Sequence, residues 1–187
     1  TSSITMTIDN SVPVLTSVDK NSIKQGGIAT ITGSGFTDSY ESPIASLKIN
    51  NATTGVGSFN VDNATTIKLT AGSGNVAHTK ITVTDEAGNA STNDVKIAID
   101  NTAPSISSIT DTDGNAKSLG KNGDQIEIRG NNFVLSGTDD SIVKFGGQTT
   151  AALGITVNSI TNTKITLTLG ASEVSSAQVT VTDEAEN

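Results

Sequence analysis

The chain has 187 residues, with 11 Lys and Arg against 19 Asp and Glu, so its formal net charge is −8. Phosphate repels an acidic chain that has no dense Lys/Arg cluster, which argues against a nucleic-acid or anionic-lipid partner. With no Cys and one His, disulfides, thiolate metal sites and a Cys nucleophile are excluded, and a histidine-based triad or zinc site is disfavoured. No apolar run approaches the ~20 residues of a membrane span.

Along the chain, three sequence anchors occur twice in the same order, which indicates two copies of one unit. They pair residues 8–13 with 99–104, residues 30–36 with 127–133, and residues 82–87 with 180–185, at spacings of 91, 97 and 98. The spacing grows by 6 between the first two anchors. This places an insertion at residues 111–115, early in the second copy.

Each copy has the pattern of short β-strands. Apolar and polar residues alternate in segments rich in Ile, Val and Thr, with Gly, Asn, Asp and Ser between them. The clearest segments are residues 29–32, 47–49, 66–69, 80–84 and 95–99. About 90 residues per copy and no amphipathic helix of useful length predict an all-β protein made of two tandem immunoglobulin-like β-sandwich domains. Core anchors are expected at Phe36, Phe59, Phe133 and Phe145.

The domain boundaries follow from the repeat. Residues 11–101 are predicted as the first immunoglobulin-like domain and residues 102–187 as the second. Residues 1–10 align with the last strand of the first copy, so they are interpreted as the final strand of a preceding unit or as a donor strand. The second copy then has its last strand missing or supplied in trans. Two hypotheses stay open: a piece of a longer tandem array, or a filament built by donor-strand complementation between subunits.

A family resemblance comes from Pro13, Gly26 and Gly27, and residues 31–36, with a second set at residues 128–133 and 143–147. This pattern resembles the IPT/TIG domain, an immunoglobulin-like fold of cell-surface receptors, Rel-type transcription factors and bacterial surface proteins. The acidic turn followed by Ile-Asp-Asn-Thr-Ala-Pro is similar to the joints of tandem modules in large prokaryotic adhesins and surface-layer proteins. The resemblance implies fold more strongly than function, because this fold supports many roles.

Acidic residues are expected to gather at the joints between modules, because the last hairpin turn of a seven-stranded unit lies where its first strand enters. Ca²⁺ takes about 6–8 oxygen ligands of the kind that Asp, Glu and Asn supply. The calcium hypothesis therefore names Asp9, Asn10, Asp85, Glu86, Asp100, Asn101, Asp183 and Glu184. The alternative is a solvated turn, in which Asp and Asn only make local hydrogen bonds.

A weaker calcium candidate is formed by Asp111, Asp113 and Asn115, with Asp124 nearby. It begins like a helix-loop-helix calcium loop, but the twelfth position, where that loop needs Glu, is Asn122. That version is rejected, and an ordinary polar loop is the alternative.

These features favour a non-enzymatic, extracellular, cell-surface segment such as an adhesin stalk, a surface-layer lattice or a filament. Its expected partners are neighbouring immunoglobulin-like domains or identical subunits, without nucleic acid and without a membrane span. The alternative is a carbohydrate- or protein-binding module that uses the loops at residues 37–42 and 135–140 and an exposed Tyr40. An accessory domain of a secreted enzyme is the third reading.

Overall fold

The computed structural model describes residues 3–37, 44–134 and 141–187, and the all-β expectation is confirmed. The only helical element in these residues is one 3-10 turn, η1 (Ala151–Leu153), and no helix among them is long and apolar enough to cross a membrane. The chain divides into two compact units, Thr1–Asn101 and Thr102–Asn187, and we describe each by itself.

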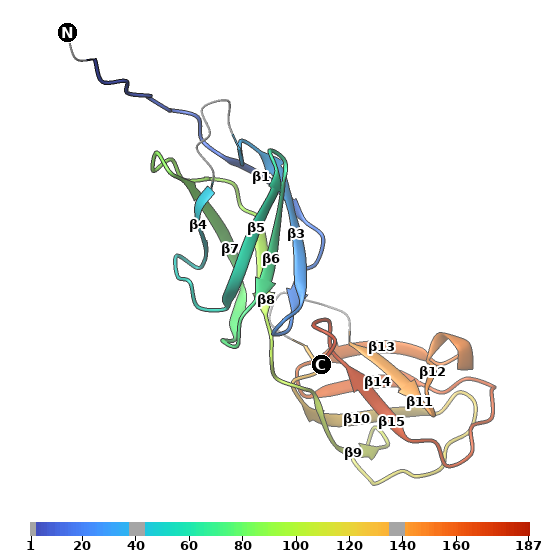
Figure 1. Cartoon of the computed structure of the whole chain (residues 1–187). Helices are drawn as coiled ribbons and strands as arrows, with labels where there is room; N and C mark the ends of the chain where they lie inside the picture. The colour runs from blue at the N-terminus through green and yellow to red at the C-terminus, as the bar shows by residue number, and fades with distance from the viewer. Residues whose placement is uncertain (1–2, 38–43, 135–140) are drawn as a thin grey trace. The chain divides into compact units, whose positions relative to one another are not determined.

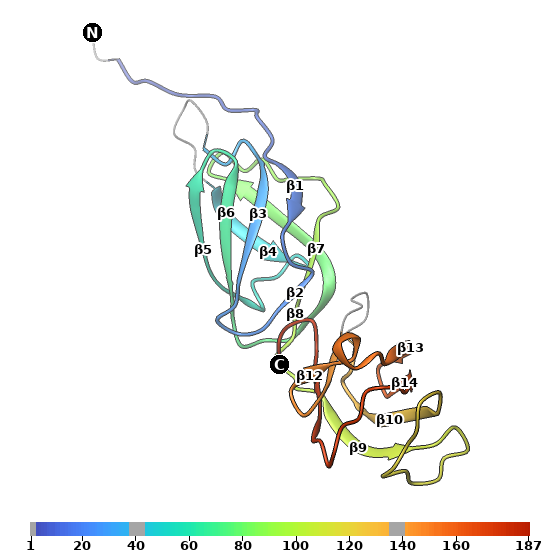
Figure 2. The same cartoon turned by 90° about the vertical axis from the view of Figure 1, so that its right-hand side faces the viewer.

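Unit 1 is a sandwich of two four-stranded sheets (Figures 1 and 2). The first sheet has the order β1-β3-β6-β5, with β1 (Val14–Val18), β3 (Ile28–Ser34), β6 (Thr66–Ala71) and β5 (Val56–Asn63). The second has the order β2-β8-β7-β4, with β2 (Ser22–Ile23), β8 (Lys96–Ile99), β7 (Val76–Asp85) and β4 (Ile44–Ile49). Within this sheet β8 runs antiparallel to β7 and parallel to β2.

The core of unit 1 lies between these sheets and follows the period of two that the sequence shows. Ile31 and Leu69 of the first sheet and Ile81 and Ile97 of the second have no exposed surface. Full burial of one such side chain contributes roughly 1.5–3 kcal/mol to folding. The alternation of Ile, Val and Leu with Thr and Lys therefore decides which face of each strand turns inward.

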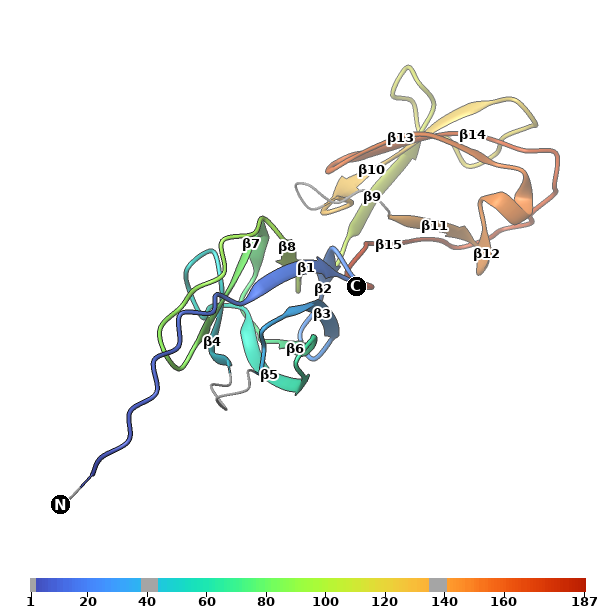
Figure 3. The ribbon, with the colours of Figure 1, turned by 90° about the horizontal axis from the view of Figure 1, so that it is seen from above.

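Unit 2 repeats the architecture with fewer strands in one layer (Figure 3). Its four-stranded sheet has the order β13-β14-β10-β9, with β13 (Thr156–Thr161), β14 (Lys164–Thr168), β10 (Gln125–Asn131) and β9 (Ser105–Thr110). The second sheet has, in the described residues, the order β12-β11-β15, with β12 (Gln148–Thr149), β11 (Ile142–Phe145) and β15 (Val179–Thr182). Its core centres on Ile128, Ile165, Leu167 and Phe133.

The repeated Gly-x-x-Phe sequence, Gly33 to Phe36 and Gly130 to Phe133, lets a buried ring and a neighbouring strand pack against the same backbone in each unit. The Phe36 and Phe133 rings are fully buried, whereas Phe59 and Phe145 are partly buried against the same cores. A Cβ atom on Gly33 would lie 2.6 Å from Cζ of Phe36 and collide with the Val14 carbonyl, and Gly130 has the same surroundings. Glycine therefore lets the neighbouring strand and the ring approach the same backbone.

Candidate functional site

The turn after β7 contains Asp85 and Glu86 and is held by Asp85 itself. Oδ1 of Asp85 accepts the Asn89 backbone N–H at 2.8 Å, and Oδ2 accepts Asn89 Nδ2 at 3.0 Å. The main chain closes the hairpin through Asp85 N–H to the Asn89 carbonyl, at 3.1 Å. Asp85 is buried and Glu86 is exposed, so of the two acidic residues only Asp85 packs inside unit 1.

This turn lies beside the residues that precede β1. Asn89 Nδ2 also donates to the Asp9 carbonyl oxygen, at 3.2 Å. The Asp9 carboxylate accepts the Ser11 N–H at 2.8 Å, which is a local turn contact of the kind Asp favours. Asp9 and the acidic turn are therefore neighbours in unit 1, while Asn10 is exposed.

The turn after β15 repeats this construction in unit 2. Oδ1 of Asp183 accepts the Asn187 backbone N–H at 2.8 Å, and Oδ2 accepts Asn187 Nδ2 at 3.0 Å. Asp183 is buried. Glu184 differs from its counterpart Glu86, because its Oε2 atom is buried without a hydrogen-bond partner among the described residues.

The inserted loop after β9 is a third copy of the same turn. Oδ1 of Asp111 accepts the N–H groups of Asp113 and Asn115, at 3.0 and 2.8 Å, and Oδ2 accepts Asn115 Nδ2 at 3.2 Å. The hydrogen bonds from Asn115, foremost the one from its backbone N–H, lower the pKa of Asp111 below its usual value. The weaker calcium candidate is thus a self-contained hairpin turn.

A spacing of four residues between Asp and Asn unites the three turns, and our sequence analysis did not use it. The third turn residue after each Asp has a left-handed backbone, with φ of 91° at Gly88, 90° at Gly114 and 69° at Glu186. The pattern Asp-x-x-Gly-Asn of the turns at Asp85 and Asp111 was readable from the sequence, since Asn and Gly mark such turns, and the turn at Asp183 departs from it only in having Glu186 in place of the Gly. The motif predicts a locked hairpin whether or not an ion is bound.

Asp100 and Asn101 lie at the end of β8, within unit 1. The Asp100 N–H donates to the Ile23 carbonyl at 3.1 Å, and Asp100 is buried. Asn101 contacts two loops. Its N–H donates to Asn75 Oδ1 at 2.9 Å and its Nδ2 reaches the Gly72 carbonyl at 3.4 Å, both between β6 and β7, and its Oδ1 accepts the Gln25 N–H between β2 and β3. Asn101 therefore closes one end of the sandwich.

The calcium hypothesis stays a prediction. Within residues 3–37, 44–134 and 141–187, no three His, Asp or Glu side chains come together as a group that could hold a metal ion. A calcium ion in this part of the chain would therefore need Asn side chains, main-chain carbonyls or water among its ligands, which Ca²⁺ accepts.

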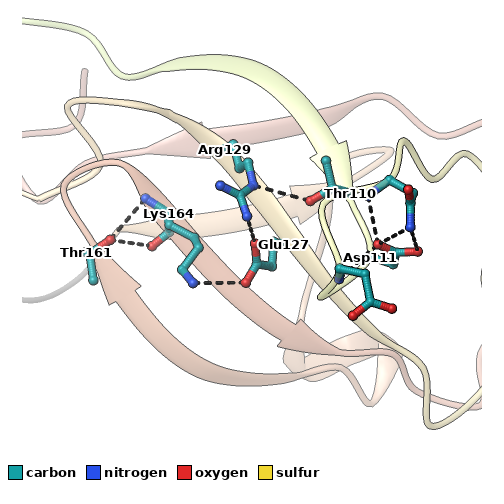
Figure 4. Close-up of polar contacts among 8 residues, drawn as sticks. Thr110, Asp111, Glu127, Arg129, Thr161 and Lys164 are labelled. Carbon is teal, nitrogen blue, oxygen red and sulfur yellow. Dashed lines mark hydrogen bonds and ion pairs between the residues drawn. The ribbon is translucent and has the colours of Figure 1, made fainter.

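A charged cluster that our sequence analysis missed covers the outer face of β10 and β14 (Figure 4). Glu127, whose side chain is only 8% exposed, pairs with Lys164 Nζ at 2.9 Å and with Arg129 Nη2. Arg129 Nε also donates to Thr110 Oγ1 at 3.3 Å. The signal was available, because Glu127 and Arg129 are two residues apart on one strand and therefore share a face.

The cluster also fixes the charge of Glu127. The hydrogen bond from Lys164 is the main cause that holds the pKa of Glu127 below its usual value, and the nearby Arg129 charge acts in the same direction. Burial opposes this shift. The counterparts in unit 1 are uncharged, with Thr30 and Thr32 on β3 and Thr66 on β6. These charges therefore belong to one copy of the repeat.

The loops named for the binding-module alternative fall almost wholly outside the described residues. Only Thr37 of residues 37–42 is described, and residues 135–140 and Tyr40 are not. That alternative stays untested by the structure.

Comparison with protein families explains the repeat. The family model described as IPT/TIG domain matches residues 13–99 and again residues 104–186. The resemblance seen in the sequence is thus confirmed over both copies. Comparison with curated proteins found no match.

Several solved structures are similar to this chain at low identity. The surface glycan-binding protein PbSGBP-B from Prevotella bryantii is 17% identical with a TM-score of 0.43, over 96% of this chain and 41% of that one. The Escherichia coli adhesin FdeC is 18% identical with a TM-score of 0.35, over 83% and 55% of the two chains. The Yersinia pseudotuberculosis adhesin InvE is 14% identical with a TM-score of 0.30, over 94% and 56%.

The chain therefore spans between two fifths and just over half of the length of these three proteins. With TM-scores below 0.5, these likenesses carry no argument about what this chain binds.

Proposed function

The chain belongs to the IPT/TIG domain family, and from this premise we propose that it is a structural, non-enzymatic segment of an extracellular cell-surface assembly. Adhesin stalks, surface-layer lattices and filaments are assemblies of this kind. Its modules would act mechanically, because a sandwich core resists unfolding and a surface rich in Ser, Thr and Asn stays solvated.

The observation that carries this proposal is the use of the acidic turn residues. Both carboxylate oxygens of Asp85, Asp111 and Asp183 accept hydrogen bonds from an Asn four residues later in the same turn. Hydrogen bonds to a charged group contribute about 1.5–3 kcal/mol each. Carboxylates that accept these hydrogen bonds stabilise their hairpins and are poorly placed to act as a general acid or a nucleophile.

Mechanical unfolding of the 187-residue chain tests the proposal. We expect two force peaks, one for each module, each releasing about 30 nm of chain at roughly 3.5 Å for every extended residue. Unfolding without measurable force would contradict a mechanical role. Saturable binding of an oligosaccharide from a glycan panel, measured by calorimetry, would favour the binding-module alternative instead.

Calcium is a second part of the proposal. Two features support it: Glu184 Oε2 is buried without a partner in the described residues, and the turn at Asp85 lies beside Asp9. A cation would relieve the cost of an unsatisfied buried carboxylate oxygen. The candidate ligands are those of the two acidic hairpins, Asp9, Asn10, Asp85 and Glu86 in unit 1 and Asp183 and Glu184 in unit 2, with Asp100 and Asn101.

Thermal unfolding with Ca²⁺, Mg²⁺ or a chelator tests this part. At a Kd of about 1 mM, 10 mM Ca²⁺ would stabilise the folded state by about 1.4 kcal/mol and raise Tm by roughly 5–10 °C. Glu184→Gln should lose this shift. Asp62→Asn is the matched control, because Asp62 pairs with Lys68 outside the turns. Loss of this carboxylate should leave the rise of Tm in Ca²⁺ unchanged. Equal Tm values in Ca²⁺ and chelator would end the calcium hypothesis.

A further inference from the structure

The tripeptide Asn-x-Ser/Thr occurs three times in the chain, at Asn51, Asn63 and Asn89, and all three copies lie in unit 1. Our sequence analysis did not use this motif. In exported proteins it is the acceptor for Asn-linked oligosaccharides when the Asn lies on the surface and the middle residue is not Pro. The middle residue is Ala in all three copies. Which of them can act as acceptors therefore depends on the exposure of each amide in the folded chain.

Asn51 lies in an exposed two-residue hairpin turn after β4. The flanking residues exchange two main-chain hydrogen bonds, at 2.8 and 3.1 Å, so the turn consists of Asn50 and Asn51. Both have a left-handed backbone, with φ of 53° and 59°, as in a type I′ turn, where Asn is favoured. Residues 51–53 are all exposed, so solvent reaches both the Asn and the Thr of this copy.

Asn63 begins a second hairpin turn, between β5 and β6. Its Oδ1 accepts the backbone N–H and the Oγ1 hydroxyl of Thr65, at 2.9 Å each, which is a local turn of the kind Asn favours. Nδ2, the atom that carries the sugar in a glycosylated Asn, has no hydrogen-bond partner within the part of the chain that the structure describes. Residues 63–65 are exposed, so the amide nitrogen of Asn63 is accessible.

Asn89 differs from the other two because its amide is already bonded. Its Nδ2 donates to Asp85 Oδ2 at 3.0 Å and to the Asp9 carbonyl at 3.2 Å. Ser91, the hydroxyl residue of this copy, is buried, and its Oγ accepts the Val83 N–H at 3.1 Å. A sugar on Asn89 would break these contacts. The folded chain therefore offers two of the three copies to a transferase.

Both accessible amides belong to edge strands of unit 1. In the described residues β4 ends the second sheet and β5 ends the first, and the two strands contact each other. Asn51 comes two residues after β4, and Asn63 is the last residue of β5. An open edge can pair with another chain, and natural proteins cover or charge such edges. A bulky, solvated oligosaccharide at each place would hinder that pairing.

Unit 2 has the same two turns without the motif. In the turn between β11 and β12, Gly147 takes the place of Asn51. In the turn between β13 and β14, Thr161 takes the place of Asn63. A Thr two positions later is present in both turns of unit 2. One substitution in each turn would therefore complete the motif.

We propose that Asn51 and Asn63 are acceptor sites for an Asn-linked oligosaccharide and that Asn89 of the folded chain is not. The donor is an oligosaccharide linked to a lipid diphosphate, and an oligosaccharyltransferase catalyses the transfer. A bond forms between Nδ2 of the Asn and C1 of the first sugar, while the C1–O bond to the diphosphate breaks. The lipid diphosphate leaves with the bonding electron pair, and the amide nitrogen gives one proton to a base of the transferase. This inference deepens the proposed function, because it rests on the extracellular placement.

Peptide mapping by mass spectrometry, on the chain isolated from the cells that make it, is the direct test. We expect oligosaccharide on Asn51 and Asn63 and none on Asn89. Asn51 and Asn63 found unmodified in that protein would overturn the proposal. Sugar on Asn89 to the same extent as on the other two would overturn the selection that the fold is proposed to make.

Transfer to the folded, unmodified chain isolates the structural part of the proposal. With a purified oligosaccharyltransferase and its lipid-linked donor, we expect the mass of the chain to rise by two oligosaccharides. Thr53→Ala and Thr65→Ala keep each Asn and should each abolish one addition, whereas Thr53→Ser and Thr65→Ser should retain it.

A synthetic peptide of residues 86–94 is the control for Asn89. It should accept sugar more than about tenfold faster than Asn89 of the folded chain, because the folded chain must first open the turn. A folded chain that accepts no sugar while the peptide does would overturn the proposal.

Substitutions in unit 2 give the converse test. Gly147 is exposed with φ 82°, and a Cβ atom there would meet nothing within 4 Å, so Asn, which tolerates this backbone, fits. Gly147→Asn and Thr161→Asn should each add one oligosaccharide. Gly146→Asn, in the same turn but without a Thr two positions later, is the matched control and should add none. Folded variants that gain no sugar would contradict the assignment from turn geometry.

Failure of this inference is distinguishable from failure of the mechanical role. A native chain without sugar that still gives two force peaks would remove the glycosylation sites and keep the mechanical role. A glycosylated native chain that unfolds without measurable force would do the reverse. The transfer assay supplies its own enzyme and donor, so its outcome does not depend on where the chain resides.

Discussion

The second sheets of the two units differ at one edge, where unit 1 has β8 and β2 beside β7 and the described residues of unit 2 have no strand beside β15. In unit 1, β8 covers β7, and Ile81 and Val83 are fully buried. In unit 2, the described residues leave the same edge of β15 unpaired, and Val179 and Val181 are partly buried. The first sheets are alike, with order β1-β3-β6-β5 in one unit and β9-β10-β14-β13 in the other. The first sheet and the buried Phe are therefore alike in the two units, whereas the core positions beside β8 in unit 1 are more deeply buried than their counterparts in unit 2.

The largest expected effect comes from damaging β8. Ile97→Ala removes a fully buried side chain and should destabilise unit 1 by about 2–5 kcal/mol, leaving the unfolding transition of unit 2 in place. Calorimetry of the whole chain would resolve the two transitions. Lys96→Ala, its exposed neighbour, is the control. A single transition that moves as a whole would show that the units do not unfold separately.

The next largest effect tests whether the turns at Asp85 and Asp183 are equivalent. Asp85→Ala removes the acceptor of the Asn89 backbone N–H and one of the two acceptors of Asn89 Nδ2, at a cost of about 1–3 kcal/mol to unit 1. Asp183→Ala should cost unit 2 a similar amount. Urea unfolding of each variant measures both. A large loss in one unit and none in the other would refute the equivalence of the two hairpins.

A reciprocal exchange tests the left-handed position of these turns. Glu186 has φ 69°, where its counterpart Gly88 has φ 91°. A side chain in this backbone region costs about 1 kcal/mol that glycine does not. Glu186→Gly should therefore stabilise unit 2 and Gly88→Glu should destabilise unit 1, by about 1 kcal/mol each. If both substitutions stabilised, or both destabilised, their units, Glu186 and Gly88 would not occupy equivalent left-handed positions.

The smallest effect concerns the charged cluster that unit 1 lacks. The folded-state pKa of Glu127 is lowered from its ordinary value of 4.5, first by the Lys164 hydrogen bond. Its contribution to stability is therefore complete above pH 4.5 and is lost as the pH falls through the lowered pKa.

Glu127→Gln should lower the Tm of unit 2 at pH 7, and the difference from the parent chain should shrink below pH 4.5. Thr30→Gln at the matching place in unit 1 should show no such pH dependence. A Tm difference that stays constant between pH 7 and 3 would argue against an ionised Glu127.

The repeat and the alternation of side chains predicted the class of fold from particular residues. The anchor residues 30–36 and 127–133 placed β3 and β10, and the inward positions Ile31 and Ile128 followed from the period of two. β5 was not among the segments singled out, because residues 56–63 mix Gly, Ser, Asn and Asp with their apolar residues and a strand there needs β6 as its neighbour. Local patterns identify strands that carry their own apolar face, and miss strands that depend on pairing.

The sequence by itself determined the two copies, the family and the identity of the acidic turn residues, because these depend on residue types and spacings within short segments. Only the tertiary structure decided which distant residues meet, since Asn89 reaches the Asp9 carbonyl and Glu127 meets Lys164 only once the chain folds back on itself. The open edge of β15 was likewise a matter of which strands become neighbours. Hydrogen bonding and burial join residues that are distant in sequence, and no local pattern specifies them.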